Sequence, residues 1–361
     1  AQTVRGVVVD AASTPVAGVV VLLVNGATVV ARSLSNNRGE FRLAPGVAGM
    51  YRVRTLRIGY RPVTSAPLTL RAGETVSQRI ALTGVRLELD TIKVVDRRAC
   101  RTTGDSAVAT FAMWEQVRAA LTATQLTASA RVIVATTVRY ERTVDPGLRH
   151  VRDQTANVRS DYVEEPWRSQ PMDSLRRFGY VVRGRDDSTT YNAPGIEVLE
   201  SDAFIADHCF RLASSRDPKL LGIAFEPTPD RRAVAEVAGT LWLDRATSEL
   251  RQLEFHYVNV PNIPREVSDR SGGDIRFARM RDGGWVIAGW DIRMPLFDYE
   301  TNLGQREAHI DGFKVSGGEL SLARRARDTL WSRPRLALAG TVADSSGRRL
   351  GGARIALRGT T

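Results

Sequence analysis

Apolar and polar residues alternate along the first part of the chain, in short segments that turn signals separate. Residues 51–56, YRVRTL, show the alternation clearly, and this pattern is typical of a half-buried β-strand. Turn signals occur at Asn25-Gly26, Asn36-Asn37 and Ala72-Gly73. The strands that we predict cover residues 4–10, 19–24, 28–33, 39–43, 51–56, 61–63, 75–82 and 89–94.

Short strands with frequent turns favour a β-sandwich. In such a fold, alternate residues of each strand point into a core between two sheets. We expect this core to contain Val7, Val9, Val21, Leu23, Phe41, Val53 and Ile80.

The apolar period changes to three or four residues after Ser106, which predicts one substantial helix. Asp105 or Ser106 is suited to cap the helix N-terminus. Trp114 lies on the apolar face, so we interpret it as a core residue. The residues of this face are Phe111, Trp114, Val117, Leu121 and Leu126.

Strand patterns resume after the helix and continue to about residue 322. Hairpin signals occur at residues 244–248 and 282–284. A second short helix is expected over residues 203–212, where it would carry His208 and Cys209. The predicted strands cover residues 132–141, 158–163, 179–183, 197–199, 220–226, 233–244, 250–258, 273–281, 285–294 and 309–316.

Residues 339–357 repeat the pattern of residues 4–23 without a gap. In each copy an apolar strand leads through an Asx-containing turn, with Pro or Gly, into a second apolar strand. The aligned pairs are Gly6 with Gly340, Asp10 with Asp344, Val16 with Leu350, Gly18 with Gly352 and Leu23 with Leu357.

The first copy has the pattern V-x-G-x-V-x-D…P-V-x-G-V-x-V-x-L, and SNNRGEF (35–41) and IGY (58–60) follow it. On these residues the chain resembles the carboxypeptidase regulatory-like domain, a prealbumin-like β-sandwich, over residues 3–95. A partial second copy covers residues 338–361. The resemblance implies an architecture and a location, because such modules are appended to envelope peptidases and to TonB-dependent outer-membrane receptors. It implies no reaction.

The middle region combines the helix with successive hairpins, and this arrangement is similar to the half-barrel wrapped on a helix in periplasmic lipoprotein carriers. We therefore predict a mainly β chain. An N-terminal prealbumin/Ig-like β-sandwich precedes an α+β domain with one main helix and a long antiparallel meander sheet.

Composition shifts predict the domain boundaries. Residues 1–95 form the sandwich, 96–104 a linker, 105–322 the helix-and-sheet domain, 323–337 a basic connector and 338–361 the second module. The connector composition is compatible with a helix that ends before Pro334. Two strands cannot bury a core alone. Either the chain ends inside a second module, or these strands add to another sheet in this molecule or a neighbour.

The 361 residues are 43% apolar, which is enough for two or three domains with their own cores. The apolar run at residues 16–24 contains Gly18 and is far shorter than the roughly 18 residues that span a bilayer. The chain begins at Ala1 without Met, as is typical after signal-peptide removal. We therefore expect an exported protein of the bacterial periplasm or cell surface, peripheral to the membrane and without a transmembrane helix.

The formal net charge is +11, and the pI is about 10.3. Arg supplies nearly all of the positive charge, since Lys occurs only at Lys93, Lys219 and Lys314. The basic residues are scattered among acidic ones rather than blocked, which disfavours a nucleic-acid partner. An anionic lipid surface or an acidic protein is the partner that such a charge favours.

Cys100 and Cys209 are the two cysteines of the chain. An even count in an exported protein predicts a disulfide between them, and two buried free thiols are the alternative. No CxxC or Cys/His cluster occurs, so we expect no metal and no cofactor. The sequence also lacks GxSxG, P-loop and GxGxxG motifs. Each histidine is isolated, without the spacing of a zinc-binding pair: His150, His208, His256 and His309.

The adjacent carboxylates at residues 164–165 and 186–187 would point to opposite faces of a strand, so neither pair forms a convergent dyad. We interpret both as solvated loop residues. Tryptophans could line a glycan or lipid site, although the strand alternation around two of them, Trp242 and Trp290, favours core or interface positions. The tryptophans considered are Trp167, Trp242, Trp285 and Trp290.

These observations favour a non-enzymatic exported scaffold or docking protein, as an accessory or structural subunit of a periplasmic or membrane-associated assembly. The alternatives are a carrier of lipid or another hydrophobic ligand, and a hydrolase whose site the sequence does not reveal. Expected partners are envelope proteins or a membrane complex, anionic lipid, and other copies of the chain through its terminal strands. No catalytic residue is expected. The expected contact residues are Arg324, Arg325, Arg327, Trp331, Arg348, Arg349, Ile355 and Leu357.

Overall fold

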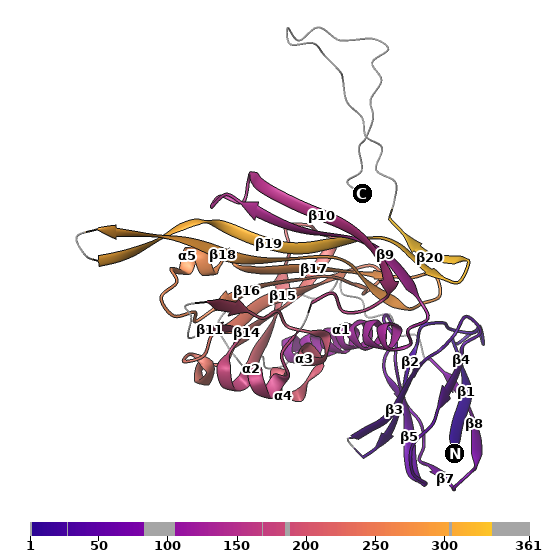
Figure 1. Cartoon of the computed structure of the whole chain (residues 1–361). Helices are drawn as coiled ribbons and strands as arrows, with labels where there is room; N and C mark the ends of the chain where they lie inside the picture. The colour runs from indigo at the N-terminus through magenta and orange to yellow at the C-terminus, as the bar shows by residue number, and fades with distance from the viewer. Residues whose placement is uncertain are drawn as a thin grey trace, which may run out of the picture.

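The computed structural model describes residues 2–26, 28–82, 105–167, 169–184, 188–302 and 305–333. These residues form a mainly β structure, with an N-terminal β-sandwich and a large antiparallel sheet, which confirms the predicted fold class. In Figure 1 the helix α1 (Asp105–Ser129) lies beneath the large sheet, and the sandwich lies below one end of that sheet.

The sandwich consists of two facing sheets. One has the order β4-β1-β8, with β1 and β8 parallel, and the other has the order β3-β2-β5-β6, with β7 also paired to β5. As predicted, its core contains Val21, Leu23, Phe41, Val53 and Ile80. The strands are β1 (Thr3–Val9), β2 (Val20–Asn25), β3 (Thr28–Leu34), β4 (Glu40–Leu43), β5 (Gly49–Leu56), β6 (Val63–Thr64), β7 (Leu68–Leu70) and β8 (Thr75–Ala81).

The inner face of β1 differs from the prediction. Val4 and Val8 are fully buried in the sandwich core, whereas Val7 is only half-buried and Val9 is buried outside that cluster. Residues 7–9 are three consecutive valines, so the local sequence has no alternation that would identify the inner face. Pairing with β4 and β8 decides it instead.

The large sheet has the order β10-β9-β19-β18-β17-β16-β15-β14-β13, and β20 also pairs with β19. From β13 to β19 the spatial order follows the chain order, so this part is the predicted antiparallel meander. A separate ribbon contains β11 (Val181–Arg183) and β12 (Thr189–Tyr191). The strands of the large sheet are β9 (Val134–Val144), β10 (Val151–Tyr162), β13 (His208–Ser214), β14 (Leu220–Pro227), β15 (Glu236–Asp244), β16 (Leu250–Val258), β17 (Gly272–Arg279), β18 (Trp285–Asn302), β19 (Gln305–Arg325) and β20 (Asp328–Ser332).

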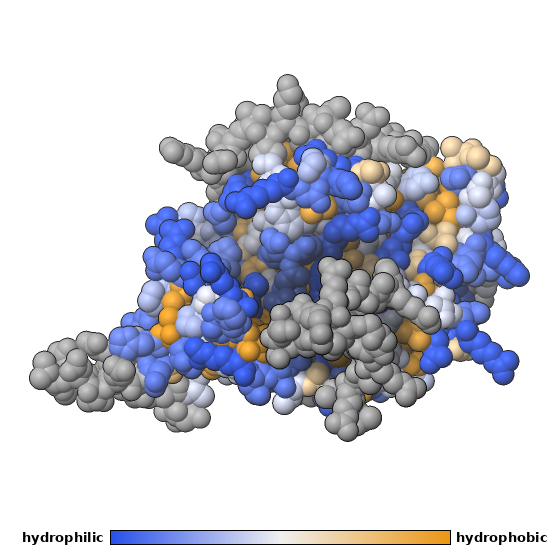
Figure 2. Space-filling model, turned by 90° about the horizontal axis from the view of Figure 1, so that it is seen from above, coloured by the Kyte–Doolittle hydropathy of each residue, from blue (hydrophilic) through white to orange (hydrophobic). Residues whose placement is uncertain are grey.

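One edge strand of the large sheet, β10, has both faces exposed along nearly its whole length. Figure 2 looks onto the side where β9, β10 and β19 lie. This face is largely hydrophilic, with a few separate hydrophobic patches. Charged side chains such as Arg152 and Asp161 are typical of edge strands that avoid pairing with another sheet.

The helix α1 packs on one face of the large sheet, which we call the inner face. Met113, Trp114 and Leu121 are buried there, together with inner-face residues of the strands. Phe111, which the helical period placed on the apolar face, is instead 64% exposed. The shorter helices are α2 (Met172–Phe178), α3 (Ile196–Glu200), α4 (Asp202–Asp207), α5 (Arg265–Ser268) and the 3₁₀ helix η2 (Pro229–Arg231).

The strand β2 joins the sandwich to the rest of the molecule, because it is buried on both faces. Val21 and Leu23 point into the sandwich core, whereas Val20 and Leu22 belong to the core around α1. A strand that is buried on both faces has a continuous apolar sequence. This explains the apolar run at residues 19–24.

Two expectations of helix are wrong. The helix α4 ends at Asp207, and β13 begins at His208, so His208 and Cys209 lie in a strand. The connector expected from residue 323 also lacks a helix over its described part, because β20 turns back and pairs with β19. Strand pairing supplies backbone hydrogen bonds there, and basic composition alone does not predict it.

Parts of the predicted organisation fall outside the described residues. They are the strand at 89–94, the linker at 96–104, Cys100, the acidic pair at 186–187 and the second module at 338–361. These features stay predictions.

Candidate binding groove on the outer face of the large sheet

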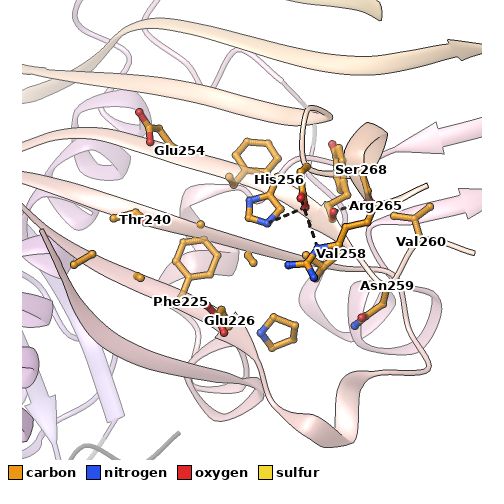
Figure 3. Close-up of a pocket in the computed structure, with 18 of the residues that line it drawn as sticks. Phe225, Glu226, Thr240, Glu254, His256, Val258, Asn259, Val260, Arg265 and Ser268 are labelled. Carbon is orange, nitrogen blue, oxygen red and sulfur yellow. Dashed lines mark hydrogen bonds and ion pairs between the residues drawn. The ribbon is translucent and has the colours of Figure 1, made fainter. Parts of the chain in front are cut away.

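The face of the large sheet opposite α1, which we call the outer face, carries a groove of about 990 Å³. Strands β13 to β17 form its floor, and the segment that contains α5 forms one wall. In Figure 3, Thr240, Glu254 and His256 extend from the strands, while Arg265 and Ser268 lie on the α5 side.

The strand β16 shows how the sequence separates groove from core. Leu253, Phe255 and Tyr257 point inward and are buried in the core around α1. The residues between them, Glu254 and His256, point outward and line the groove. The period of two in a β-strand therefore places apolar residues against the helix and polar residues in the groove.

Short side chains leave room along the floor. Ala213, Ala224 and Ala238 line the groove on β13, β14 and β15. At one end, a Cβ on Gly222 would come within 2.6 Å of the Trp242 ring, so this glycine allows the indole to lie close to the backbone. Trp242 is half-buried and presents an apolar surface beside polar groups.

Cross-strand register places three carboxylates in one row on the outer face. Glu254 of β16 stands opposite Asp274 of β17, which stands opposite Asp291 of β18. Residues opposite each other in antiparallel strands have Cβ atoms about 4.5–5.5 Å apart, and like charges at that distance repel. The row therefore needs compensating donors.

Arginines and polar donors surround the row. Arg276 Nε lies 3.6 Å from Asp274 Oδ1, and Arg293 Nη1 lies 3.6 Å from Asp291 Oδ1. Beside them, the Gln252 amide donates to Asp274. These contacts supply positive charge and hydrogen-bond donors along the row.

Glu254 has its own two donors. The Gln252 amide donates to Glu254 Oε1 at 2.9 Å, and Trp242 Nε1 donates to Glu254 Oε2 at 3.0 Å. The exposed carboxylate is therefore held in a defined orientation at the edge of the groove.

Burial changes the acid–base behaviour of the row. It raises the pKa of Asp274 to about 6, and the neighbouring Asp291 carboxylate raises it further, whereas Gln252 and Arg276 lower it. Burial also raises the pKa of Asp291, which Arg293 and Arg276 oppose. Asp274 and Asp291 thus bind protons more readily than surface aspartates.

The opposite end of the groove contains His256. Its Nε2 lies 4.0 Å from Asp269 Oδ1, and Arg265 Nε lies 3.6 Å from Asp269 Oδ2 (Figure 3). Burial lowers the pKa of His256, although Asp269 opposes this shift. The imidazole is therefore neutral at neutral pH.

The groove lacks the contacts of a nucleophilic site. Among the described residues, no hydroxyl or thiol forms a hydrogen bond with the His256 ring. The nearby Ser268 Oγ donates instead to the Tyr257 carbonyl at 2.7 Å. Nucleophilic catalysis requires a nucleophile within reach of its base. The arrangement of donors, acceptors and the Trp242 ring is suited to recognition.

The predicted contact residues that the structure describes meet at one hairpin, away from this groove. Arg324 and Arg325 end β19, Arg327 lies in the turn, and Trp331 belongs to β20. Arg324 and Arg327 are exposed. Arg325 Nη2 lies 2.7 Å from the buried Asp282 Oδ2, and Trp331 packs against a small core. The last two residues therefore stabilise the hairpin, and the binding role of all four stays a prediction.

The other predicted contact residues, Arg348, Arg349, Ile355 and Leu357, lie outside the described residues. The predicted disulfide joins Cys209 to Cys100. Cys209 lies in β13 opposite Glu226, whereas Cys100 lies outside the described residues. The pairing stays a prediction.

Glu164 and Glu165 follow the end of β10 and line the same cavity, and Glu165 is not a solvated loop residue. Glu164 is 63% exposed, and its Oε1 lies 3.3 Å from Arg139 Nη2. Glu165 faces a cavity of about 130 Å³ and accepts a hydrogen bond from the Ile196 backbone N–H at 3.4 Å. Its Oε1 is buried without a partner among the described residues. Burial raises the pKa of Glu165 to about 7.

The carboxylate row was not predicted from the sequence, because only carboxylates adjacent in sequence were considered as pairs. Glu254, Asp274 and Asp291 come together through the register of three strands. One signal was present: polar residues at every second position of residues 252–256 mark an outward face. The sequence does not reveal which polar faces become neighbours.

Of the tryptophans considered as ligand platforms, Trp285 and Trp290 are buried in the core, as is Trp114, and Trp167 packs against it. Trp242 lines the groove. Across the described ranges, no cluster of three or more His, Cys, Asp or Glu residues has an arrangement that could bind a metal ion. None of the helices found in those ranges combines the length and apolar character of a membrane span.

Comparison with known proteins finds a family match for one part of the chain. The family model of the carboxypeptidase regulatory-like domain matches residues 3–83. No curated protein matches the chain significantly. Among solved structures, 5-hydroxyisourate hydrolase of Klebsiella pneumoniae is 16% identical, with a TM-score of 0.20, over 23% of this chain and 91% of the hydrolase chain.

An outer membrane lipoprotein-sorting protein domain from Vibrio parahaemolyticus is 14% identical, with a TM-score of 0.27, over 57% of this chain and 91% of that domain. The sequence motifs, the observed sandwich and the family match agree over the first strands of the molecule. Residues 3–83 match the carboxypeptidase regulatory-like domain, and in this molecule they pack against the helix of a large antiparallel sheet.

Proposed function

We propose that this chain is a non-enzymatic docking protein of the bacterial envelope, and that the groove on the outer face receives a protein partner. The observation that carries the proposal is the shared core of its two parts. Val20 and Leu22 of the sandwich are buried in the same apolar cluster as Met113 and Trp114 of α1.

Polar contacts reinforce this joint. Arg54 Nη2 lies 2.7 Å from Glu115 Oε2, and the Glu115 side chain is only 4% exposed. The Gly59 backbone N–H donates to Gln116 Oε1 at 2.7 Å. Domains that move freely meet through small polar surfaces. A joint with an apolar core and a buried carboxylate supports a rigid scaffold that holds its binding surfaces in one geometry.

The groove has the chemistry of a docking surface. Its lining contains arginines and carboxylates in similar number, with one half-buried tryptophan. Interfaces of this kind obtain specificity from complementary charges and affinity from a few aromatic or arginine residues. Trp242 and Arg211 are the groove residues of these types that lie at its β13–β15 end.

The carrier alternative receives less support from the inner face. A carrier of hydrophobic ligands needs free apolar space. In this protein, Trp114, Val117 and Leu121 of α1 occupy the face of the sheet that such a cavity would use. The cavity beside Glu165 is about 130 Å³ and contains a buried carboxyl group. A cryptic hydrolase likewise lacks an assembled nucleophile in the groove.

The envelope location is part of the proposal, and the match to the regulatory-like domain supports it. The partner would be another envelope protein or a membrane complex, with this chain as an accessory subunit. Self-association through terminal strands and contact with anionic lipid are further expectations of the same model.

The test is affinity purification of the chain from its native envelope after gentle crosslinking, followed by mass spectrometry of proteins and lipids. A Thr240→Arg variant places a long side chain on the groove floor. Thr155→Arg makes the same change on exposed β10 and serves as the control. We expect a stoichiometric partner with the wild type and the control, and its loss with Thr240→Arg.

Recovery of a monodisperse chain without any protein partner would overturn the docking proposal. A bound lipid in place of a protein would support the carrier alternative. Equal recovery of the partner with both variants would show that the groove is not the docking site.

A further inference from the structure

A second cleft, of about 980 Å³, lies between the sandwich and α1. This volume is within the range of about 300–1,000 Å³ that small-molecule sites occupy. One wall is the face of β2, β3 and β5 that points away from the sandwich core. The other wall consists of α1 from Phe111 to Thr122, together with residues 200–202, which run from the end of α3 to the start of α4. The cleft shares no lining residue with the groove.

Cross-strand register gathers arginines on the sandwich wall. Leu22 of β2 stands between Arg32 of β3 and Arg54 of β5. Two residues further along β2, Val24 stands opposite Arg52 of β5. The residues between these positions, such as Leu23 and Val53, point into the sandwich core. The side chains that face the cleft are therefore those of Leu22, Val24, Arg32, Arg52 and Arg54.

Two arginines of the cleft are committed to a buried carboxylate. Arg54 Nη2 lies 2.7 Å from Glu115 Oε2, and Arg118 Nη1 lies 3.7 Å from Glu115 Oε1. These two residues therefore neutralise the charge that the helix carries into the joint.

Three other guanidinium groups in the cleft have no carboxylate within 4 Å among the described residues. Arg32 Nη1 donates to the Gln125 side-chain oxygen at 3.2 Å, and Arg52 Nη1 donates to the Ser65 carbonyl at 3.3 Å. Arg61 forms neither a hydrogen bond nor an ion pair within the described part of the chain. These groups can bind an anion, because guanidinium matches carboxylate and phosphate oxygens in pairs.

Apolar side chains adjoin these arginines. Val24 and Val29 are half-buried on the sandwich wall, and Phe111 of α1 is 64% exposed on the other. Contiguous apolar surface can mark a ligand site, and Phe111, Val24 and Val29 line one cleft here.

Negative charge lies on the far wall. Glu200 accepts a hydrogen bond from Thr122, and Asp202 is exposed beside it. A ligand with an acidic head is therefore repelled from the end of α3 and attracted to the sandwich wall. The cleft has the polarity to orient such a ligand.

We propose that this cleft binds an anionic amphiphile, which carries one carboxylate or phosphate head on an acyl chain. The head contacts the arginine wall around Arg52 and Arg61, and the chain packs against Val24, Val29 and Phe111. A free anion would leave the apolar wall uncovered, and a neutral amphiphile would leave the guanidinium groups unmatched. This inference is independent of the groove and its docking function.

The test is a binding titration of the full chain with dodecanoate and dodecyl phosphate below their micelle concentrations. Inorganic phosphate probes the anion alone, and dodecyl maltoside probes the apolar chain alone. We expect both anionic amphiphiles to bind at least about tenfold more tightly than either probe, with affinity that falls as salt rises.

Two double variants remove equal charge from the sandwich. Arg52→Ala/Arg61→Ala removes the uncommitted guanidinium groups of the cleft. Arg42→Ala/Arg79→Ala removes exposed arginines of β4 and β8, on the other sheet. The cleft variant should lose about tenfold or more in affinity, and the control less than about twofold. Equal unfolding midpoints of the two variants would exclude loss of fold as the cause.

Phe111→Ser should weaken binding of the dodecyl ligands without changing the response to inorganic phosphate. The proposal fails if inorganic phosphate binds as tightly as dodecyl phosphate, since the cleft would then hold an adventitious ion only. It also fails if dodecyl maltoside binds as tightly, or if the two double variants lose affinity equally.

Discussion

Arg54 of the sandwich forms a 2.7 Å ion pair with Glu115 of α1, across the joint between the two parts of the molecule. The pair is asymmetric: the Arg54 side chain is 33% exposed, whereas the Glu115 side chain is 4% exposed. The carboxylate thus depends on its partners, Arg54 and Arg118, for the interactions that water would otherwise supply.

We expect Glu115→Ala to lower the free energy of unfolding by about 2 kcal/mol, because it leaves two arginines of the joint without their carboxylate. Urea denaturation measures the change. Glu226→Ala is the control, since it removes an exposed carboxylate that pairs with Arg211, and surface pairs contribute about 0–1 kcal/mol. Equal losses in the two variants would show that the joint is no more than a surface contact.

Two glycines of the sandwich have similar backbone angles but different surroundings. Gly18 has φ +68°, and a Cβ there would lie 2.2 Å from the Gly283 carbonyl oxygen. Gly26 has φ +59°, and a Cβ there would meet nothing within 4 Å. Gly26→Ala should lower the free energy of unfolding by about 1 kcal/mol, the cost of a left-handed alanine.

Gly18→Ala should lower it by about 1–3 kcal/mol more, because the sandwich must move away from the turn between β17 and β18. Thermal or urea denaturation of both variants measures the difference. A difference near zero would mean that the approach of Gly18 to Gly283 does not restrain the joint.

Burial of Glu165 predicts a stability that depends on pH. Its pKa is about 7 in the folded protein, raised from an ordinary value of 4.5, so the folded state binds the proton more tightly than the unfolded state. Stability is therefore highest below about pH 4.5 for this group and falls as pH rises toward 7. Glu165→Gln should remove this loss and stabilise the protein at pH 8 by about 2–3 kcal/mol, since each pKa unit corresponds to about 1.4 kcal/mol.

The advantage of Glu165→Gln over the wild type should disappear near pH 4. Glu164→Gln, at the exposed neighbouring position, should change stability by less than about 0.5 kcal/mol at both pH values. Denaturant curves at pH 4 and pH 8 test both variants. A pH-independent effect of Glu165→Gln would contradict the buried state of this carboxyl group.

The predicted disulfide between Cys100 and Cys209 can be tested by alkylation under denaturing conditions. We expect no alkylation of the unreduced protein and two alkyl groups after reduction. Closing a loop of about 110 residues would stabilise the fold by up to about 4 kcal/mol in the chain-entropy model. Alkylation without reduction would establish free thiols, and Cys209→Ser should then leave stability nearly unchanged.

The sandwich and its resemblance to the regulatory-like domain were accessible from sequence because their signals are local. Turn residues such as Asn36 and Gly39 lie beside the strands that they connect, and residues 51–56 alternate within one strand. The Ile58-Gly59-Tyr60 motif was equally recognisable. Its contact with Gln116 of α1 was not, because the helix lies far away in the chain.

The candidate site was less accessible, because it depends on pairing between distant segments. The outward position of Glu254 follows from alternation within β16. Its place beside Asp274 and Asp291 requires the register of β16, β17 and β18. The arginine cleft has the same origin, since Arg32 and Arg54 meet on either side of Leu22 only when β2 pairs with both neighbours.

The sequence by itself determined the β-rich class, the main helix, the match to the regulatory-like domain and the alternation within strands such as β5 and β16, because periodicity and turn chemistry act over a few residues. Tertiary structure alone decided that β2 is buried on both faces, that Phe111 is exposed and that Glu165 is half-buried beside a cavity. Burial and charge depend on neighbours that are distant in sequence, and packing of the complete chain determines which neighbours those are.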